Sequence, residues 1–402
     1  MSDVIVAGHI CLDISPKIHA NGLAMEAVLR PGKLVNAGKC CVSLGGPVSN
    51  TGIALSILGQ DVALMCKVGD DLFGEIVVKK IEEYGTQKAV AVDAASDTSY
   101  TVALVVPGYD RIFIHDPGAN NTFTASDIIF DEVAKCKLFH FGYPPLMKQM
   151  YQNGGNELAT IFKNAKELGA TTSLDMSLPD RSSESGRQDW NTILENTLKY
   201  VDIFVPSVEE ILFMLYPEQY DTFVKEHQGE NDPLDTLDMD ILPILGQRLM
   251  DLGCKIAVIK CGVRGYYVRT AENLEGFGRV KPANVQDWCG REILCESFHI
   301  DNIISATGSG DSSIAGFLSA FLNGETITEC MEIACTTGAE NLTAQDALSG
   351  IRSMEDTLAF RETLRKNVYD YTGNYWVRDT ASGLQYGKKD AHFKLLSQIP
   401  LK

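Results

Sequence analysis

The sequence predicts an α/β fold with a doubly wound, mostly parallel sheet, helices on both of its faces and a small β-sheet lid. Apolar runs bounded by glycine alternate with segments of helical periodicity, which is typical of a parallel sheet covered by helices. Glycine-rich turns open two of the predicted helices. Two stretches, at about 14–44 and 98–118, break the alternation with alternating residues and turns, and we expect them to form the lid.

The first half of the chain shows the alternation clearly. Short apolar runs, several of them rich in valine or isoleucine, predict strands, and longer segments with apolar residues every three or four positions predict helices. In chain order we expect a strand at 4–6, a helix at 47–58, a strand at 62–68, a helix at 74–84, a strand at 138–142, a helix at 157–168, a strand at 172–176 and a helix at 193–199.

The second half continues the pattern. In chain order we expect a strand at 203–206, a helix at 209–215, a helix at 242–252, strands at 255–260 and 266–270, and helices at 312–322 and 328–341. A loop is expected at 179–190, and the acidic, weakly periodic stretch 217–240 predicts a surface insertion. Polar and aromatic residues dominate from about residue 353. We therefore expect one domain at 1–352 and a C-terminal extension, 353–402, packed on it.

Composition limits the classes of partner. The 402 residues carry a net charge of −18, which argues against nucleic acid and anionic membranes as partners. The chain begins as a strand without a basic leader, and no apolar run reaches the length of a membrane span, so we expect a cytoplasmic protein. Eleven cysteines without a C-x-x-C pair predict reduced core thiols rather than disulfides or a metal site.

The most informative segment runs from Ser305 to Asp311 and precedes an amphipathic helix. Its two glycines let backbone N–H groups converge on an anion, and the helix dipole adds partial positive charge there. Asp311 would hold a carboxylate beside this anion hole, where it can accept a proton. The alternative is that Asp311 is only the N-cap of the helix. This segment alone favours neither interpretation.

Two further clusters lie where a ligand of such a sheet would bind. Gly45 and Gly46 precede Asn50 at the start of the first long helix, and Asp13 follows the first strand. A helix cap and an ordinary turn aspartate are the simpler interpretations. Asp175, at the end of another strand, is a secondary candidate for a substrate contact.

Taken together, these motifs resemble those of the ribokinase/PfkB family of carbohydrate and nucleoside kinases. The resemblance covers about residues 3–348. Its blocks are Gly8 to Asp13, Gly45-Gly46 to Asn50 with Leu58-Gly59, Val68-Gly69-Asp70-Asp71 to Gly74, Gly118-Ala-Asn120, Pro206 to Glu210, Gly262 to Gly265, and Thr307-Gly308-Ser309-Gly310-Asp311. It implies a ribokinase-like fold with a β lid and an ATP-dependent phosphotransferase that acts on an alcohol group.

The resemblance also implies roles for the phosphate and substrate residues. Asp311 would be the general base, and the backbone N–H groups of Gly308, Ser309 and Gly310 would bind the transferred phosphoryl group. The residues implied to hold substrate hydroxyls are Asp13, Gly45, Gly46 and Asn50, with Asp175 as a further candidate.

The nucleotide and its metal are implied to lie at a second group of residues. ATP would bind along Lys260, Gly262 and Gly265, with Thr307 and with the helix that carries Asn341. Glu210 would help to hold Mg²⁺ through water. A monovalent cation stays open, because Ser305 and Ala306 stand where the family often has an acidic residue.

The chain departs from the family pattern in ways that affect the substrate. Cys11 replaces a frequent asparagine, Pro47-Val48 replaces a common Lys-Gly, and Lys260 stands where a small hydroxyl residue is usual. A sugar or sugar-like substrate is the leading expectation. The alternatives are a nucleoside kinase of the same fold and a catalytically silent sugar- or nucleotide-binding regulator. A homodimer formed through the lid is a further expectation.

Overall fold

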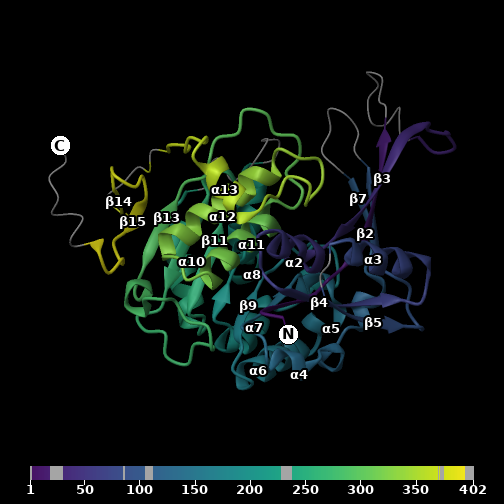
Figure 1. The fold of residues 1–402 in the computed structure, drawn as a ribbon, viewed down its shortest axis with the longest axis horizontal. Helices are drawn as coiled ribbons and strands as arrows, with labels where there is room; N and C mark the ends of the chain where they lie inside the picture. Colours follow the sequence, from purple (N-terminus) through teal and green to yellow (C-terminus); the bar gives the residue numbers. More distant parts are fainter. Residues whose placement is uncertain are drawn as a thin grey trace.

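The computed structural model describes residues 2–18, 30–84, 87–104, 112–227, 238–369, 371 and 375–393. An 11-stranded sheet runs through it in the order β14-β15-β13-β12-β11-β10-β9-β8-β1-β4-β5 (Figure 1). The parallel part consists of β1 (Val4–Gly8), β4 (Val62–Gly69), β5 (Gln87–Asp93), β8 (Leu138–Gly142), β9 (Thr171–Leu174), β10 (Ile203–Phe204) and β11 (Ile256–Lys260). The expected mostly parallel, doubly wound sheet is confirmed.

The sheet ends in an antiparallel part. Outward from β11, the strands follow in the order β12 (Tyr266–Thr270), β13 (Glu292–Cys295), β15 (Gln385–Gly387) and β14 (Trp376–Arg378), and each pairs antiparallel with the strand before it. The last two belong to the C-terminal extension, which therefore adds strands to the main sheet. Residues 394–402 of the extension lie outside the described part of the chain.

Helices cover both faces of the sheet, as expected from the alternation. The helices are α2 (Pro47–Ile57), α3 (Leu72–Glu83), α4 (Phe130–Val133), α5 (Lys148–Tyr151), α6 (Asn156–Glu167), α7 (Trp190–Thr197), α8 (Val208–Leu215), α9 (Pro217–Glu226), α10 (Ile241–Asp251), α11 (Ser309–Leu322), α12 (Ile327–Asn341) and α13 (Met354–Arg361). One buried apolar cluster joins the sheet to α2, α3, α11 and α12, and a second joins it to α6, α7, α8 and α10. Alternate residues of β1 enter the two clusters, because successive strand side chains point to opposite faces.

A separate four-stranded sheet, in the order β3-β2-β6-β7, forms the predicted lid and stands off the main sheet (Figure 1). Its strands are β2 (Cys11–Ile18), β3 (Ala37–Gly45), β6 (Tyr100–Leu104) and β7 (Ile112–Asp116). The parts 19–29 and 105–111 of the predicted lid segments lie outside the described residues. The lid strand β2 follows β1 directly, and the lid strand β3 leads directly into α2. The lid is therefore connected to the carboxyl end of β1 and to the start of α2.

Two other expectations concern loops and membranes. The predicted insertion contains α9, whereas 228–237 lies outside the described residues. Nowhere in the described ranges does a helix combine the length and the apolar character needed to cross a bilayer.

Candidate active site

Asp311 lies in the first turn of α11, but it does not cap that helix. The N-cap is Gly308, with φ 78° and no side-chain cap hydrogen bond. A Cβ at Gly308 would lie 2.3 Å from the Cβ of Ala347, so both the backbone conformation and the available space require glycine. At Gly310, by contrast, the nearest atom to an added Cβ would be Lys260 Cε at 3.7 Å. The first turn of α11 is thus open on the side of Lys260.

The Asp311 carboxylate is 3% exposed and is held by two side chains from distant segments. Asn50 Nδ2 donates to Oδ2 at 2.9 Å, and the Tyr143 hydroxyl donates to the same carboxylate at 2.9 and 3.0 Å. Burial raises the pKa of Asp311, while these hydrogen bonds and the nearby Lys260 act to lower it. A buried carboxylate that is oriented from two sides at a glycine-rich helix start is suited to accept a proton.

Asn50 and Tyr143 each follow a strand, Asn50 after the lid strand β3 and Tyr143 after β8 of the main sheet. Asn50 is in the first turn of α2, and the Ser49 hydroxyl donates to its Oδ1 at 3.3 Å, which turns the Nδ2 group toward Asp311. Tyr143 follows β8 with a left-handed φ of 61°. Sequence analysis missed Tyr143. The signal available for it was its place directly after the strand 138–142, followed by two prolines.

Lys260 lies in a buried cluster of charged side chains with Asp175, Glu210 and Asp311. Its ammonium donates to Asp175 Oδ1 at 2.6 Å and to the Val205 carbonyl at 2.6 Å. Burial acts to lower the pKa of Lys260, but the carboxylates of Asp175 and Glu210 raise it overall, so the amine stays charged. Burial raises the pKa of Asp175. The Lys260 ammonium acts to lower this pKa, whereas the negative charges of Glu210 and Asp311 raise it further.

Glu210 and Asp175 are the carboxylates that a metal would meet in this cluster. Glu210 forms a capping box with Ser207, whose backbone N–H donates to its Oε2 at 2.6 Å. Asp175 Oδ2 is buried and has no hydrogen-bond partner within the described ranges. The part of the chain that the structure describes has no group of three or more His, Cys, Asp or Glu side chains that would hold a metal ion. Mg²⁺ keeps several waters and needs few carboxylates, so Glu210 and Asp175 suffice for a water-mediated contact, and the role of Glu210 stays a prediction.

Of the predicted substrate residues, Asp13, Gly45, Gly46 and Asn50 lie where the lid strands β2 and β3 meet the start of α2, whereas Asp175 lies in the Lys260 cluster. The Cys11 thiol donates to Asp13 Oδ1 at 3.3 Å and lies 3.6 Å from the Thr101 hydroxyl, so the departure at Cys11 still orients Asp13. A Cβ at Gly45 would lie 2.4 Å from Asp13 Oδ2. A Cβ at Gly46, whose φ is 88°, would lie 2.6 Å from His9 Nδ1. The two glycines thus allow the Asp13 and His9 side chains to approach the backbone of the turn before α2.

His9 is a buried residue that sequence analysis did not assign to the site. It is 2% exposed, and neither ring nitrogen has a hydrogen-bond partner among the residues described. Its ring centroid lies 5.4 Å from that of His115 on the lid and 6.2 Å from that of Tyr143. Burial, with a smaller contribution from His115, lowers the pKa of His9 to about 3, so the ring is a neutral donor and acceptor.

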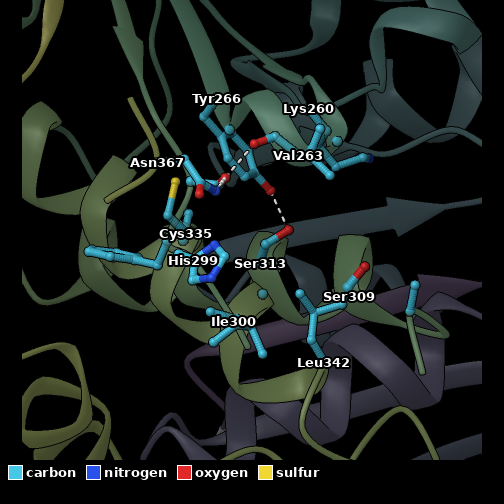
Figure 2. A pocket seen from close by; sticks show the side chains of 18 of the residues that line it. Lys260, Val263, Tyr266, His299, Ile300, Ser309, Ser313, Cys335, Leu342 and Asn367 are labelled. Carbon is cyan, nitrogen blue, oxygen red and sulfur yellow. Dashed lines mark hydrogen bonds between the residues drawn. The ribbon is translucent and has the colours of Figure 1, made fainter. Parts of the chain in front are cut away.

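A cavity of about 520 Å³ opens on the other side of the first turn of α11 (Figure 2). Lys260, Gly262, Gly265, Ser309 and Gly310 line it, and their roles toward a nucleotide and its phosphates stay predictions. The rest of its wall is mainly apolar, and Val263, Phe298, Ile300, Ile303, Ala339 and Leu342 belong to it. A pocket with a few polar groups and an apolar wall is typical of a small-molecule site.

Two predicted nucleotide residues are placed differently. Asn341 is buried and donates to the Ala347 carbonyl at 2.9 Å, so α12 contributes to the cavity through Gly338 and Ala339 instead. The Thr307 backbone and hydroxyl both contact the Ser305 hydroxyl, at 3.2 and 3.1 Å, and Thr307 is not in the cavity wall. Their predicted contacts with a nucleotide remain untested.

The geometry places a buried carboxylate at a glycine-rich helix start between a polar substrate region and an apolar cavity. The sequence matches the model of the pfkB family carbohydrate kinases over residues 1–353. The chain belongs to the PfkB family. Its enzyme class is that of a carbohydrate kinase, a phosphotransferase with an alcohol group as acceptor.

The relatives of this PfkB kinase are distant in sequence. It is 25% identical over 299 residues to an uncharacterized sugar kinase of Archaeoglobus fulgidus, covering 74% of this chain and 98% of that one. It is 25% identical over 341 residues to the probable fructokinase-6, chloroplastic, of Arabidopsis thaliana, covering 81% and 75% of the two chains.

Solved structures show the same ribokinase-like fold. A ribokinase of Arabidopsis thaliana complexed with ribose and ATP superimposes with a TM-score of 0.64 at 16% identity, over 90% of this chain and 99% of that one. A fructokinase of Xylella fastidiosa with bound ATP gives a TM-score of 0.66 at 15% identity, over 90% and 99%.

Proposed function

We propose that this PfkB kinase transfers the γ-phosphoryl group of ATP to a hydroxyl of a sugar, with Asp311 as the general base. The observation that carries the proposal is the buried Asp311 carboxylate, oriented by Asn50 and Tyr143 at the open first turn of α11. Solved relatives with ATP bound and fructokinase relatives support the choice of nucleotide and of acceptor class.

In the proposed reaction the nucleotide lies in the 520 Å³ cavity, with its phosphates toward Ser309 and Gly310. The acceptor hydroxyl gives its proton to Asp311 while its oxygen forms a bond to the γ-phosphorus. The bond from phosphorus to the bridging β–γ oxygen breaks, and ADP leaves. The backbone N–H groups at the start of α11 and the Lys260 ammonium bear the charge on the transferred group, which is the main form of catalysis in phosphoryl transfer.

The acceptor is proposed to lie between the lid and α2. Asp13, Asn50 and the neutral His9 present hydrogen-bond acceptors and donors from three segments, which suits a molecule with several hydroxyl groups. The lid strand β2 carries Asp13, and β7 carries His115 against His9. Closure of the lid over the acceptor would exclude water that competes for the phosphoryl group.

Mg²⁺ is proposed to be bound with the nucleotide, and Glu210 is the residue of this chain that would hold it through water. A Mg²⁺ ion in this position would neutralise part of the phosphate charge. The buried, unpaired Oδ2 of Asp175 supports a polar ligand on the same side.

We also propose that two copies pair through their lids. The edge strands β3 and β7 bear exposed apolar side chains, with Val42 38% and Ile114 54% exposed. Covering such side chains at a sheet edge is the usual way to avoid uncontrolled association. Sedimentation velocity should give a dimer, and Ile114→Glu should shift it to monomer. A monomeric wild-type protein would contradict the lid dimer and leave the kinase proposal intact.

The activity is tested by screening sugars and nucleosides with Mg-ATP for ADP release. We expect turnover with a sugar, and Asp311→Asn should lower kcat at least about 100-fold with little change in ATP affinity. Turnover of nucleosides only would establish the nucleoside kinase instead. Ligand binding without any turnover would establish a silent regulator, and a near-normal rate in Asp311→Asn would exclude Asp311 as the base.

A further inference from the structure

The wall of the large cavity includes residues from outside the family domain. The family match ends at residue 353, yet Asn367 and Tyr369 line the cavity. They lie on a short segment after α13, part of the C-terminal extension. The extension therefore contributes to the site in which the proposed function places the nucleotide.

Backbone and side-chain contacts bind this segment to the cavity wall. Phe298 and Lys366 form an antiparallel bridge, and Asn367 N donates to the Ser297 carbonyl at 2.9 Å. The Tyr369 hydroxyl donates to the Val263 carbonyl at 3.0 Å. The Arg264 guanidinium lies 4.6 Å from the centre of the Tyr369 ring. The segment is thus a fixed part of the wall.

The hydrogen bonds determine which way the Asn367 amide faces. The Ser297 hydroxyl donates its proton to the Val263 carbonyl, so toward Asn367 it can only accept. Asn367 Nδ2 donates to that hydroxyl oxygen at 2.9 Å. The amide nitrogen therefore faces Ser297, and Oδ1 has no hydrogen-bond partner among the residues that the structure describes. This leaves one carbonyl-type acceptor on a residue that lines the cavity.

The position of Asn367 corresponds to the base end of a nucleotide. Figure 2 shows Lys260 and Ser309 on one side of the cavity and Asn367, Cys335 and His299 on the other. The phosphates would lie toward Lys260 and the open start of α11. The base would then lie among the apolar wall residues near Asn367.

We propose that Asn367 selects the nucleotide by accepting a hydrogen bond from the exocyclic amino group of adenine. Guanine has a carbonyl at the corresponding ring position, so it would place an acceptor against the acceptor Oδ1. A site with a buried polar group rejects the ligand that leaves this group unpaired. The proposal rests on the proposed function, because it takes the cavity to be the nucleotide site.

The test is isothermal titration calorimetry of the full chain with ADP and with GDP, without acceptor. We expect the wild type to prefer ADP, and Asn367→Ala to weaken ADP binding about 5-fold without weakening GDP binding, because the acceptor that opposes the guanine carbonyl is removed. Val368→Ala is the matched control, because Val368 lies between the two lining residues and is 73% exposed. Asn367→Asp retains an acceptor and should keep the preference for ADP. Its ratio of ADP to GDP affinity therefore tests the proposal even if Asn367→Ala fails to fold.

The outcomes separate this proposal from the kinase proposal. An unchanged ratio of ADP to GDP affinity in Asn367→Ala would overturn the role of Asn367 and leave the kinase function standing. A wild type that binds ADP and GDP equally would do the same. A wild type that binds neither nucleotide would overturn both.

Discussion

The Tyr143 hydroxyl donates to both carboxylate oxygens of Asp311, at 2.9 and 3.0 Å, across 168 residues of sequence. A hydrogen bond to the charged form of an acid favours that form. Tyr143 therefore acts against burial, which by itself raises the pKa of Asp311. In the proposed mechanism, Tyr143 acts together with Asn50 and Lys260 to favour the ionised base in a buried position.

Replacing Tyr143 by phenylalanine should move the acidic limb of the pH–rate profile. Loss of one hydrogen bond to a charged group raises the pKa of Asp311, so kcat/KM should fall off at a pH higher by about one unit. The loss of rate should be larger on the acidic limb of the profile than on its alkaline side. Tyr200→Phe is a matched control. A Tyr143→Phe profile that coincides with the wild-type profile would refute the role of Tyr143.

Two glycines of the α11 start should respond differently to alanine. At Gly310 the added methyl meets nothing closer than 3.7 Å, so Gly310→Ala should melt close to wild type. The methyl would nevertheless fill space in front of the proposed anion hole, and kcat should fall roughly 100-fold. Gly308→Ala combines a φ of 78° with a 2.3 Å approach to Ala347 and should lose stability instead.

Thermal melts and steady-state rates of the two variants provide the comparison. Gly308→Ala should melt several degrees lower than wild type. A stable Gly310→Ala variant with full activity would mean that the start of α11 does not bind the phosphoryl group.

The contribution of the Lys260–Asp175 ion pair to stability can be measured separately from the contribution of Lys260 to kcat. Lys260→Met leaves a buried carboxylate without its partner, which should lower the free energy of unfolding by about 3 kcal/mol. The double variant Lys260→Met, Asp175→Asn should recover much of the stability. It should not recover kcat, because the ammonium that faces the phosphoryl group is still absent.

Urea unfolding and kcat are measured on the single and double variants. Lys166→Met is the matched control. Lys166 forms an ion pair with the buried Asp202, and neither residue lines the cavity. It should cost stability and leave kcat of the folded enzyme unchanged. Full recovery of kcat in the double variant would assign Lys260 a structural role only.

Two buried histidines should make the protein less stable in mild acid. Burial is the main factor that lowers the pKa of both His9 and His140 to about 3, against 6.5 for an unperturbed histidine. Below pH 6.5 the unfolded chain binds protons at these positions and the folded chain does not. Stability is therefore lost as the pH falls from 6.5 toward 3, by up to roughly 1.4 kcal/mol per pH unit for each histidine.

Urea unfolding at pH 7.5 and 5.5 checks this pH dependence. His140→Gln should reduce the loss between the two pH values by roughly 1.4 kcal/mol. An identical pH dependence in wild type and His140→Gln would show that His140 is not kept neutral by burial.

The alternation of apolar runs predicted the doubly wound sheet, most of its strands and helices, and the lid. It did not predict the strand β5 of the parallel part or the antiparallel strands β13, β14 and β15. The pairing of β15 with β13 is set by contacts between distant segments. Such pairing cannot be inferred from local propensity.

The site was predictable where it depends on backbone geometry. Gly46 and Gly308 have positive φ and close neighbours, so only glycine fits at either position. The sequence shows these glycines directly, which is why the two turns could be recognised from it. For Asn341, the sequence predicted the helix that lines the cavity, whereas the hydrogen bond of its side chain to the Ala347 carbonyl is visible only in the structure.

The sequence alone was enough to predict the glycine-rich turn before α11, the place of Asp311 at the start of that helix and most of the order of strands and helices, because glycine turns and apolar periodicity are local properties. The hydrogen bonds of Asn50 and Tyr143 to Asp311 are visible only in the folded chain. Tyr143, His9 and Asn367 lie on segments with no chemical motif of their own, and each acquires its role from what tertiary packing places beside it. Packing joins residues far apart in sequence, and it also gives the once ambiguous Asp311 a buried position with two hydrogen-bond donors in place of a helix cap.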